Sequence, residues 1–225
     1  MTMIESEASC GADETVEDLA SHLMTSIVLA GGKGTRLGKD KLQEVVGGRP
    51  LLQRVIDSLS PISERILVVT AQGQKWPAIR ATQSKVASVP DIYPGRGALG
   101  GIYTGLTSAK SRHSLVVAAD MPFLNPDLLQ HLVSVAPGFD VVMPRIDGEI
   151  EPLHAVYSRD CLPAIQEQIE RNQLQIRVFL ERVGVRYVEL AEIDRFDPRH
   201  LSFFNVNTPE DLTKAEEIAA EIRSS

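Results

Sequence analysis

The stretch SIVLAGGKGTRLGKDK, residues 26–41, carries the clearest indication of the fold class. Its apolar part, Ile27–Ala30, contains β-branched residues and predicts a buried strand of a parallel sheet. A glycine- and lysine-rich stretch follows this strand and extends to Gly48. Pro50 then begins a predicted helix that runs through Leu59, since proline is tolerated at the first helical position. A strand, a long loop and a helix in this order indicate the start of an α/β domain.

The rest of the chain continues to alternate between strand and helix patterns. The predicted strands are Ile66–Thr70, Val86–Val89, Leu115–Ala119, Val141–Met143, His154–Tyr157 and Val185–Leu190. The predicted helices are Leu99–Ala109, the segment from the cap Asn125 to Val135, Asp160–Ile169, and the segment from the cap Thr208 to Ile222. Such alternation implies a mainly parallel sheet with helices on both faces. No internal repeat or Ser/Gly linker interrupts residues 25–225, so we expect them to form a single α/β domain.

Residues 1–24 differ from the rest of the chain in charge. They contain six acidic residues and no Lys or Arg, whereas the remaining residues carry 23 basic and 24 acidic side chains. We expect this acidic extension to be mobile or to form a short helix, because some of its apolar residues follow helical spacing. The balanced charge of the remaining residues is unlike the basic surface of a nucleic-acid-binding protein.

The composition also narrows the class of protein. The chain is 43% hydrophobic and 24% charged, as is typical of globular domains. No apolar run approaches the ~18 residues that a membrane-spanning helix needs, and the N-terminus lacks the pattern of a secretory signal. The two cysteines, Cys10 and Cys161, form no CxxC pair. This usage fits a cytoplasmic protein in a reducing compartment.

The loop after the first predicted strand has the composition of an anion-binding loop. Glycines let the backbone approach an anion closely and expose N–H donors. Within nine residues the loop also carries Lys33, Arg36, Lys39 and Lys41. Since ligands of parallel sheets bind beyond the carboxyl ends of the strands, a phosphate-rich ligand is the simplest explanation of this charge.

The loop matches neither of the two common phosphate-binding patterns. The dinucleotide pattern G-x-G-x-x-G fails because Leu37 stands where the last glycine is needed. The pattern G-x-x-x-x-G-K-[ST] fails because Lys33 replaces its first glycine and Asp40 replaces its Ser or Thr. The chain also lacks HExxH and G-x-S-x-G, so zinc and serine hydrolysis have no support.

The loop and four later segments together resemble the molybdenum cofactor guanylyltransferases, a branch of the nucleotidyltransferases. The later segments are DIYPGRGALGGI at 91–102, ADMPF at 119–123, EPLHAVY at 151–157 and NVNTPEDL at 205–212. The resemblance implies a Rossmann-like nucleotidyltransferase fold. It also implies transfer of GMP from GTP to the phosphate of molybdopterin (the molybdenum cofactor), with Mg²⁺ as cofactor and pyrophosphate as second product. Cofactor-handling proteins are possible partners, whereas no nucleic acid or membrane is implied.

The resemblance also implies roles for individual residues. Arg36 and Lys41 would hold the triphosphate, and Asp120 would bind Mg²⁺, so these three form the implied catalytic set. The implied nucleotide-binding residues are Leu29, Ala30, Gly31, Gly32, Lys41, Asp91 and Asp120. Further implied contacts to the active site or the substrate are Glu151, His154, Asn205 and Asn207. Positive groups and a metal at the phosphates are the main means by which enzymes accelerate such transfers.

Other interpretations of these residues stay open at this point. Asp120 could cap the turn before Pro122, and Asp91 could be a turn former. The two asparagines could merely connect a strand to a helix, and Glu151 and His154 could be surface residues. At the level of function, the alternatives are a cytidylyl- or sugar-phosphate nucleotidyltransferase and a catalytically inactive nucleotide-binding scaffold.

Overall fold

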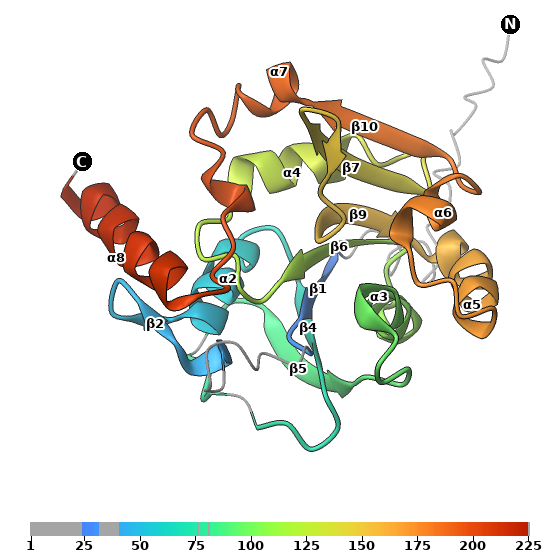
Figure 1. Ribbon diagram of the computed structural model, residues 1–225, viewed down its shortest axis with the longest axis horizontal. Helices are drawn as coiled ribbons and strands as arrows, with labels where there is room; N and C mark the ends of the chain where they lie inside the picture. Colours follow the sequence, from blue (N-terminus) through green and yellow to red (C-terminus); the bar gives the residue numbers. More distant parts are fainter. Residues whose placement is uncertain (1–23, 32–40, 76, 81, 225) are drawn as a thin grey trace, which may run out of the picture.

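The computed structural model describes residues 24–31, 41–75, 77–80 and 82–224 (Figure 1). Within these residues, eight strands form one sheet in the order β10-β7-β9-β6-β1-β4-β5, with β8 paired to β7. The strands are β1 (Thr25–Leu29), β4 (Arg65–Thr70), β5 (Lys85–Pro90), β6 (His113–Ala118), β7 (Val141–Ile146), β8 (Glu149–Ile150), β9 (His154–Ser158) and β10 (Val185–Glu189). A separate two-stranded hairpin joins β2 (Val45–Val46) to β3 (Arg49–Pro50).

The sheet is mainly parallel, as the sequence predicts. Strand β1 pairs in parallel with both β4 and β6, so that Val28 lies opposite Val68 on one side and Val117 on the other. Strands β4 and β5, and β7 and β10, are also parallel pairs. The exception is β9, which runs antiparallel between β6 and β7. Strands β1, β4, β5, β6, β7 and β10 therefore all end at one edge of the sheet, and β9 begins there.

Helices cover both faces of this sheet (Figure 1). The helices are α2 (Leu51–Leu59), α3 (Gly97–Ser108), α4 (Pro126–Ser134), α5 (Leu162–Glu170), α6 (Ile176–Leu180), α7 (Leu190–Ile193) and α8 (Pro209–Ser224). Short 3-10 turns occur at η1 (Lys41–Gln43), η2 (Arg159–Cys161) and η3 (Leu201–Phe203). The predicted caps are confirmed, since Asn125 accepts from Asp127 N at 2.9 Å and Thr208 Oγ1 accepts from Asp211 N at 3.1 Å.

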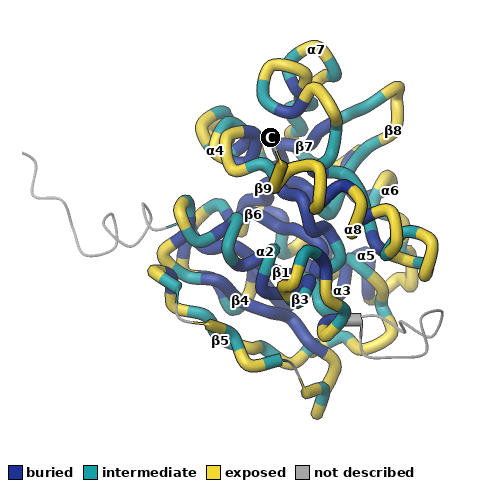
Figure 2. Tube along the Cα trace, turned by 90° about the vertical axis from the view of Figure 1, so that its left-hand side faces the viewer, coloured by how far each residue is buried: buried dark blue, intermediate teal, exposed yellow. Residues whose placement is uncertain are grey.

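Residues of the central strands β1, β4, β6, β7 and β9 divide between two separate cores, and in Figure 2 much of the buried trace belongs to these strands. On one face, Val28 and Val117 pack with the apolar sides of α2 and α4. On the other face, Ile27 and Val116 pack with α3, α5 and α6. Burial of both faces explains why these strands are continuous apolar runs in the sequence.

Helix α3 approaches β1 unusually closely because it carries glycine where the two meet. A Cβ added at Gly105 would lie 2.4 Å from Ile27 Cγ2, a distance that real Cβ atoms do not show. One turn earlier, a Cβ at Gly101 would lie 3.2 Å from Leu29 Cδ2. Glycine at both positions therefore sets the depth at which the end of β1 lies under α3.

A third, smaller core joins the C-terminal helix to the rest of the domain. Phe123, Val206 and Ile218 pack there with Val46 and Leu51, which belong to β2 and α2. This cluster brings together residues from the beginning, middle and end of the chain beside the edge where the parallel strands end (Figure 1). Among the described residues, no helix is long and apolar enough to cross a membrane.

Candidate active site

The parallel strands end in a row of exposed or partly exposed residues that the sequence singles out. Ala30 N donates to Val69 O at 2.9 Å, and Asp91 N donates to Thr70 O at 2.8 Å. Ala119 N, just before Asp120, donates to Leu29 O at 3.1 Å. The ends of β1, β4, β5 and β6 are thus joined to one another along a single edge. In sheets of this type, ligands bind at this edge.

Asp120 lies in the turn that follows β6 and is only partly buried. Its carbonyl oxygen accepts a hydrogen bond from Val206 N at 3.0 Å, which links residues 86 positions apart. This bond brings Asn205 and Asn207, the neighbours of Val206, beside the Asp120 turn. Asn205 is held by a bond from its Nδ2 to Phe203 O at 3.0 Å, and Asn207 is exposed. Asp120 and the two asparagines, predicted from separate segments, therefore lie at one place.

Asp91 is held in a fixed orientation by its own turn and by α3. Its Oδ1 accepts from Tyr93 N at 2.9 Å and from the hydroxyl of Thr104 at 2.9 Å. The turn-former interpretation of Asp91 is thus confirmed, while its position at the end of β5 keeps it on the candidate ligand edge. Gly100 permits this packing, because a Cβ there would lie 2.9 Å from Tyr93 O.

The antiparallel strand β9 brings Glu151 and His154 to the same edge. Ala118 N donates to Leu153 O at 3.2 Å, which joins the end of β6 to the start of β9. Glu151 is partly exposed, and burial together with nearby Glu149 raises the pKa of its carboxyl group. A carboxyl group with a raised pKa at a candidate ligand edge is a common feature of functional sites.

His154 is not a surface residue, so that interpretation is wrong. Its side chain is 0% exposed, because β9 lies between β6 and β7 and the ring of Phe203 covers it at 4.7 Å between centroids. Burial lowers the pKa of His154 to about 4, with nearby Asp197 opposing the shift. The imidazole is therefore neutral at pH 7 and lies beneath the site rather than on its surface.

The described part of the loop after β1 is short. Gly32 and Arg36 lie outside the described residues, and of Lys41 only the backbone is described, as the first residue of η1. Leu29 and Ala30 are partly buried at the end of β1, and Gly31 is exposed beside them. The predicted backbone contacts to a nucleotide are therefore accessible at Gly31.

Two side chains that organise this edge were missed by sequence reasoning. Gln74 accepts from Ala71 N at 3.0 Å and donates to Ala30 O at 3.4 Å, so it joins the loops after β4 and β1. Thr104 holds the carboxylate of Asp91. Gln74 gave a usable signal because it follows a predicted strand end; Thr104 gave a weaker one, as a polar residue that directly precedes a glycine of the predicted helix.

The donor chemistry of the edge fits Mg²⁺ better than a transition metal. Among the described residues, no three His, Cys, Asp or Glu side chains gather into a metal-binding group. Asp120 supplies a hard carboxylate oxygen beside the two asparagines, while the carboxylates of Asp91 and Glu151 lie elsewhere along the same edge. Mg²⁺ is usually held by one or two carboxylates together with substrate phosphates and water, so a single carboxylate is compatible with it.

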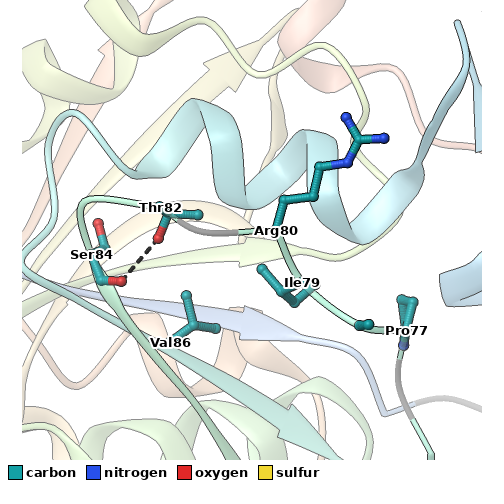
Figure 3. A pocket seen from close by; sticks show the side chains of 7 residues that line it. Pro77, Ile79, Arg80, Thr82, Ser84 and Val86 are labelled. Atoms are coloured by element: carbon teal, nitrogen blue, oxygen red, sulfur yellow. Dashed lines mark hydrogen bonds between the residues drawn. The ribbon is translucent and has the colours of Figure 1, made fainter.

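A hollow of about 510 Å³ lies between the loop after β4 and the amino end of β5 (Figure 3). Its lining includes Ile79, Thr82 and Val86. Thr82 Oγ1 donates to Ser84 O at 2.9 Å, as Figure 3 shows, and Arg80 N donates to Gln53 Oε1 at 2.8 Å. These polar groups are used by the local fold, and the hollow contains none of the predicted site residues.

Comparison with known proteins agrees with this geometry. Residues 26–187 match the family described as "MobA-like NTP transferase domain". A "Probable molybdenum cofactor guanylyltransferase" of Pelotomaculum thermopropionicum is 34% identical over 200 residues, covering 89% of this chain and 95% of that protein. A relative with the same description from Methanosarcina mazei is 36% identical over 204 residues, covering 84% of this chain and 88% of that protein.

Solved structures extend the comparison to the fold. The crystal structure of molybdopterin-guanine dinucleotide biosynthesis protein A from Archaeoglobus fulgidus superposes with a TM-score of 0.72 at 30% identity, covering 88% of this chain and all of that one. A 2-C-methyl-D-erythritol 4-phosphate cytidylyltransferase from Thermus thermophilus shares the fold at 17% identity, with a TM-score of 0.63 and coverage of 88% and 100%. By its sequence and its single nucleotidyltransferase domain, this chain belongs to the MobA-like NTP transferases, in the family of the molybdenum cofactor guanylyltransferases.

Proposed function

We propose that this protein transfers GMP from GTP to the phosphate of molybdopterin, giving molybdopterin guanine dinucleotide and pyrophosphate. The observation that carries the proposal is the hydrogen bond between Val206 N and Asp120 O. This bond brings the carboxylate of Asp120 together with Asn205 and Asn207. They lie at the edge of the sheet from which the glycine- and lysine-rich loop leaves β1. The names of the relatives in the same family support the choice of reaction.

In the proposed reaction, a phosphate oxygen of molybdopterin attacks the α-phosphorus of GTP. A new P–O bond forms, the bond from the α-phosphorus to the bridging oxygen of the β-phosphate breaks, and pyrophosphate leaves. Negative charge accumulates on the leaving group. Arg36 and Lys41 are proposed to stabilise that charge, since preorganised positive groups are the main accelerating factor in such transfers.

Nucleotide recognition is proposed to use the ends of β1 and β5. The backbone from Leu29 to Gly32 would contact the base and phosphates, and Asp91 would contact the guanine nucleotide from the opposite side. The bonds from Tyr93 N and Thr104 to Asp91 Oδ1 support this role, because they hold the carboxylate in one orientation before any ligand binds. Preorganisation of this kind lowers the entropic cost of binding.

Asp120 is the residue proposed to hold Mg²⁺, which when bound would offset phosphate charge during the attack. Glu151, Asn205 and Asn207 are proposed to face the pterin substrate, since they line the part of the edge next to β9 and the C-terminal segment. His154 is proposed to support this region from below rather than to touch the substrate, because it is fully buried.

The test is pyrophosphate release from each of the four nucleoside triphosphates, with molybdopterin supplied and with it omitted. We expect release only with molybdopterin, and a preference for GTP of at least about tenfold, since one or two mismatched base hydrogen bonds cost ~1–3 kcal/mol. Comparable turnover with CTP would assign the protein to cytidylyl transfer. Binding of GTP without pyrophosphate release would identify an inactive scaffold.

Asp120→Asn tests the proposed metal ligand within the same assay. We expect turnover to fall by a factor on the order of 10² or more, with part of the loss recovered at high Mg²⁺. Asp160→Asn is the matched control, because Asp160 is an exposed carboxylate near the opposite end of the sheet, paired with Arg112. An Asp120 variant with the Mg²⁺ dependence and rate of the control would show that Asp120 only forms the turn.

A further inference from the structure

Arg54 belongs to none of the motifs above, yet it contacts two segments of the candidate site. It lies on α2 and is half-buried. Its Nε donates to Pro122 O at 3.0 Å, and one terminal nitrogen donates to Val46 O at 3.3 Å. Its guanidinium carbon also lies 5.2 Å from the centroid of the Phe123 ring.

The first of these segments is the Asp120 turn. Pro122 is two residues beyond Asp120, so a hydrogen bond to its carbonyl restrains the end of that turn. Phe123, against which the guanidinium packs, contacts Phe204 with ring centroids 6.0 Å apart. Phe204 precedes Asn205, and therefore the contacts of Arg54 reach the segment that binds back to Asp120.

The second segment is the end of the glycine- and lysine-rich loop. Val46 is in β2, which follows η1, and η1 begins with Lys41. Leu51 N donates to Glu44 O at 2.8 Å, so this segment is also tied to the start of α2. The guanidinium group of Arg54 therefore links two segments of the chain: the one that carries Lys41 and the one that carries Asp120.

If the side chain of Arg54 served only to fill space, a positive charge would be unfavourable in this position. Burial lowers its pKa, and the nearby positive charges of Arg49 and Arg223 lower it further. The carboxylates of Asp57 and Glu216 raise the pKa of Arg54, but Asp57 is also bonded to Arg49, and Glu216 also accepts from Gly47 N at 3.0 Å. A methionine would fill the same space without the cost of burying a charge. The advantage of arginine here is its rigid set of donors, which can reach two carbonyls at once.

We propose that Arg54 is a positioning residue that fixes the Asp120 turn relative to the segment carrying Lys41. It touches no substrate, and it acts by holding two groups that must meet the same triphosphate. This inference rests on the proposed function for its effect on turnover. Small displacements of groups far from the reacting atoms can reduce rates strongly, because transfer requires the charged groups to be correctly positioned relative to the substrate.

The experiment compares Arg54→Met and Arg54→Lys with the matched control Arg159→Met. Arg159 also donates from its guanidinium to a backbone carbonyl, Ala109 O at 2.9 Å, but beyond the end of β9, away from the candidate site. We expect Arg54→Met to lower kcat/KM at least about tenfold and to raise the Mg²⁺ concentration at half-maximal rate severalfold. Arg54→Lys keeps the charge but not the planar donor set, and we expect it to be impaired in the same direction.

The control is expected to lose thermal stability while keeping the kinetics and the Mg²⁺ dependence of the wild type. If Arg54→Met matches the control in both kinetic measurements, Arg54 only packs and the inference is overturned. If Arg54→Met does not fold, Arg54→Lys decides, since wild-type kinetics in that variant would show that the donor geometry is dispensable.

A second measurement separates failure of this inference from failure of the proposed function. Amide hydrogen exchange at Val206 reports directly on its bond to Asp120 O and needs no substrate. We expect Arg54→Met to speed exchange at Val206 at least about tenfold, and Arg159→Met to leave it unchanged. Equal exchange at Val206 in the two variants would overturn the positioning role, even if the wild type proved to transfer a different nucleotide or none.

Discussion

Replacing His154 by phenylalanine should change how the stability of this protein depends on pH. The imidazole is completely buried, and neither ring nitrogen has a hydrogen-bond partner among the described residues. Its pKa in the folded state is about 4, against an ordinary value of 6.5. Between these two values the unfolded chain binds the proton more readily than the folded chain. The free energy of unfolding therefore falls as the pH is lowered through this window.

The magnitude follows from the two pKa values. A group with a pKa of 6.5 when unfolded and about 4 when folded removes about 2 kcal/mol of stability between pH 8 and pH 5. Phenylalanine keeps an aromatic ring against Phe203 but has no proton to bind, so this loss should be absent in His154→Phe. All other titratable groups are the same in both proteins, so their contributions cancel to first order in the difference.

The assay is urea unfolding of wild type and variant at pH 8, 7, 6 and 5 at constant ionic strength. Between pH 8 and pH 5, we expect the unfolding free energy of the wild type to fall by about 2 kcal/mol more than that of His154→Phe. Parallel pH profiles for the two proteins would refute the reasoning, because they would mean that the imidazole takes up its proton as easily in the folded chain as in the unfolded one.

Two further predictions concern the stability of the fold, and a third concerns the acidic extension. Gly105→Ala should destabilise the protein by about 1–3 kcal/mol in thermal unfolding, because the new Cβ would lie 2.4 Å from Ile27 Cγ2; an additional Ile27→Ala change should not add its full separate cost. Asn125→Ala should cost about 1 kcal/mol or more, since it removes a helix cap and also a bond to Phe196 O at 2.9 Å; a cost near zero in urea unfolding would contradict this. Deleting residues 1–23, which keeps Met24 and its 3.1 Å bond from Glu64 N, should leave pyrophosphate release nearly unchanged, because salt limits the reach of the acidic charges to ~8 Å; a tenfold loss with the fold intact would place these residues in the site.

The central strands and the longer helices could be predicted because their patterns are strong and local. Ile27–Ala30 and Leu115–Ala119 are apolar on both faces of the sheet, and Asn125 caps its own helix within three residues. By contrast, the hairpin of β2 and β3, the strand β8 and the helices α6 and α7 went unpredicted. Each spans five residues or fewer, so too few positions are available for a period to appear.

The residues of the candidate site also fall into two groups, those with a local signal in the sequence and those without one. The positions of Asp91 and Asp120 at this edge could be predicted, because Asp91 directly follows β5 and Asp120 lies two residues beyond the end of β6; their roles stay predictions. The burial of His154 could not be predicted, since it depends on the antiparallel placement of β9 and on the ring of Phe203. Arg54 also gave no local signal, because its partners lie 8 and 68 residues away. Contacts of that kind are properties of the topology rather than of any short stretch of sequence.

The hydrogen bond from Val206 to Asp120 has a consequence for synthesis of the chain. The strands β1, β4, β5 and β6, with the loop after β1, are complete by residue 118, long before Val206 is made. A growing chain can therefore pair β1, β4, β5 and β6 while the Asp120 turn still lacks its C-terminal partner. Residues 205–207 are thus made after the central strands, and a chain that stops before residue 205 lacks Asn205, Asn207 and the bond from Val206 N to Asp120 O.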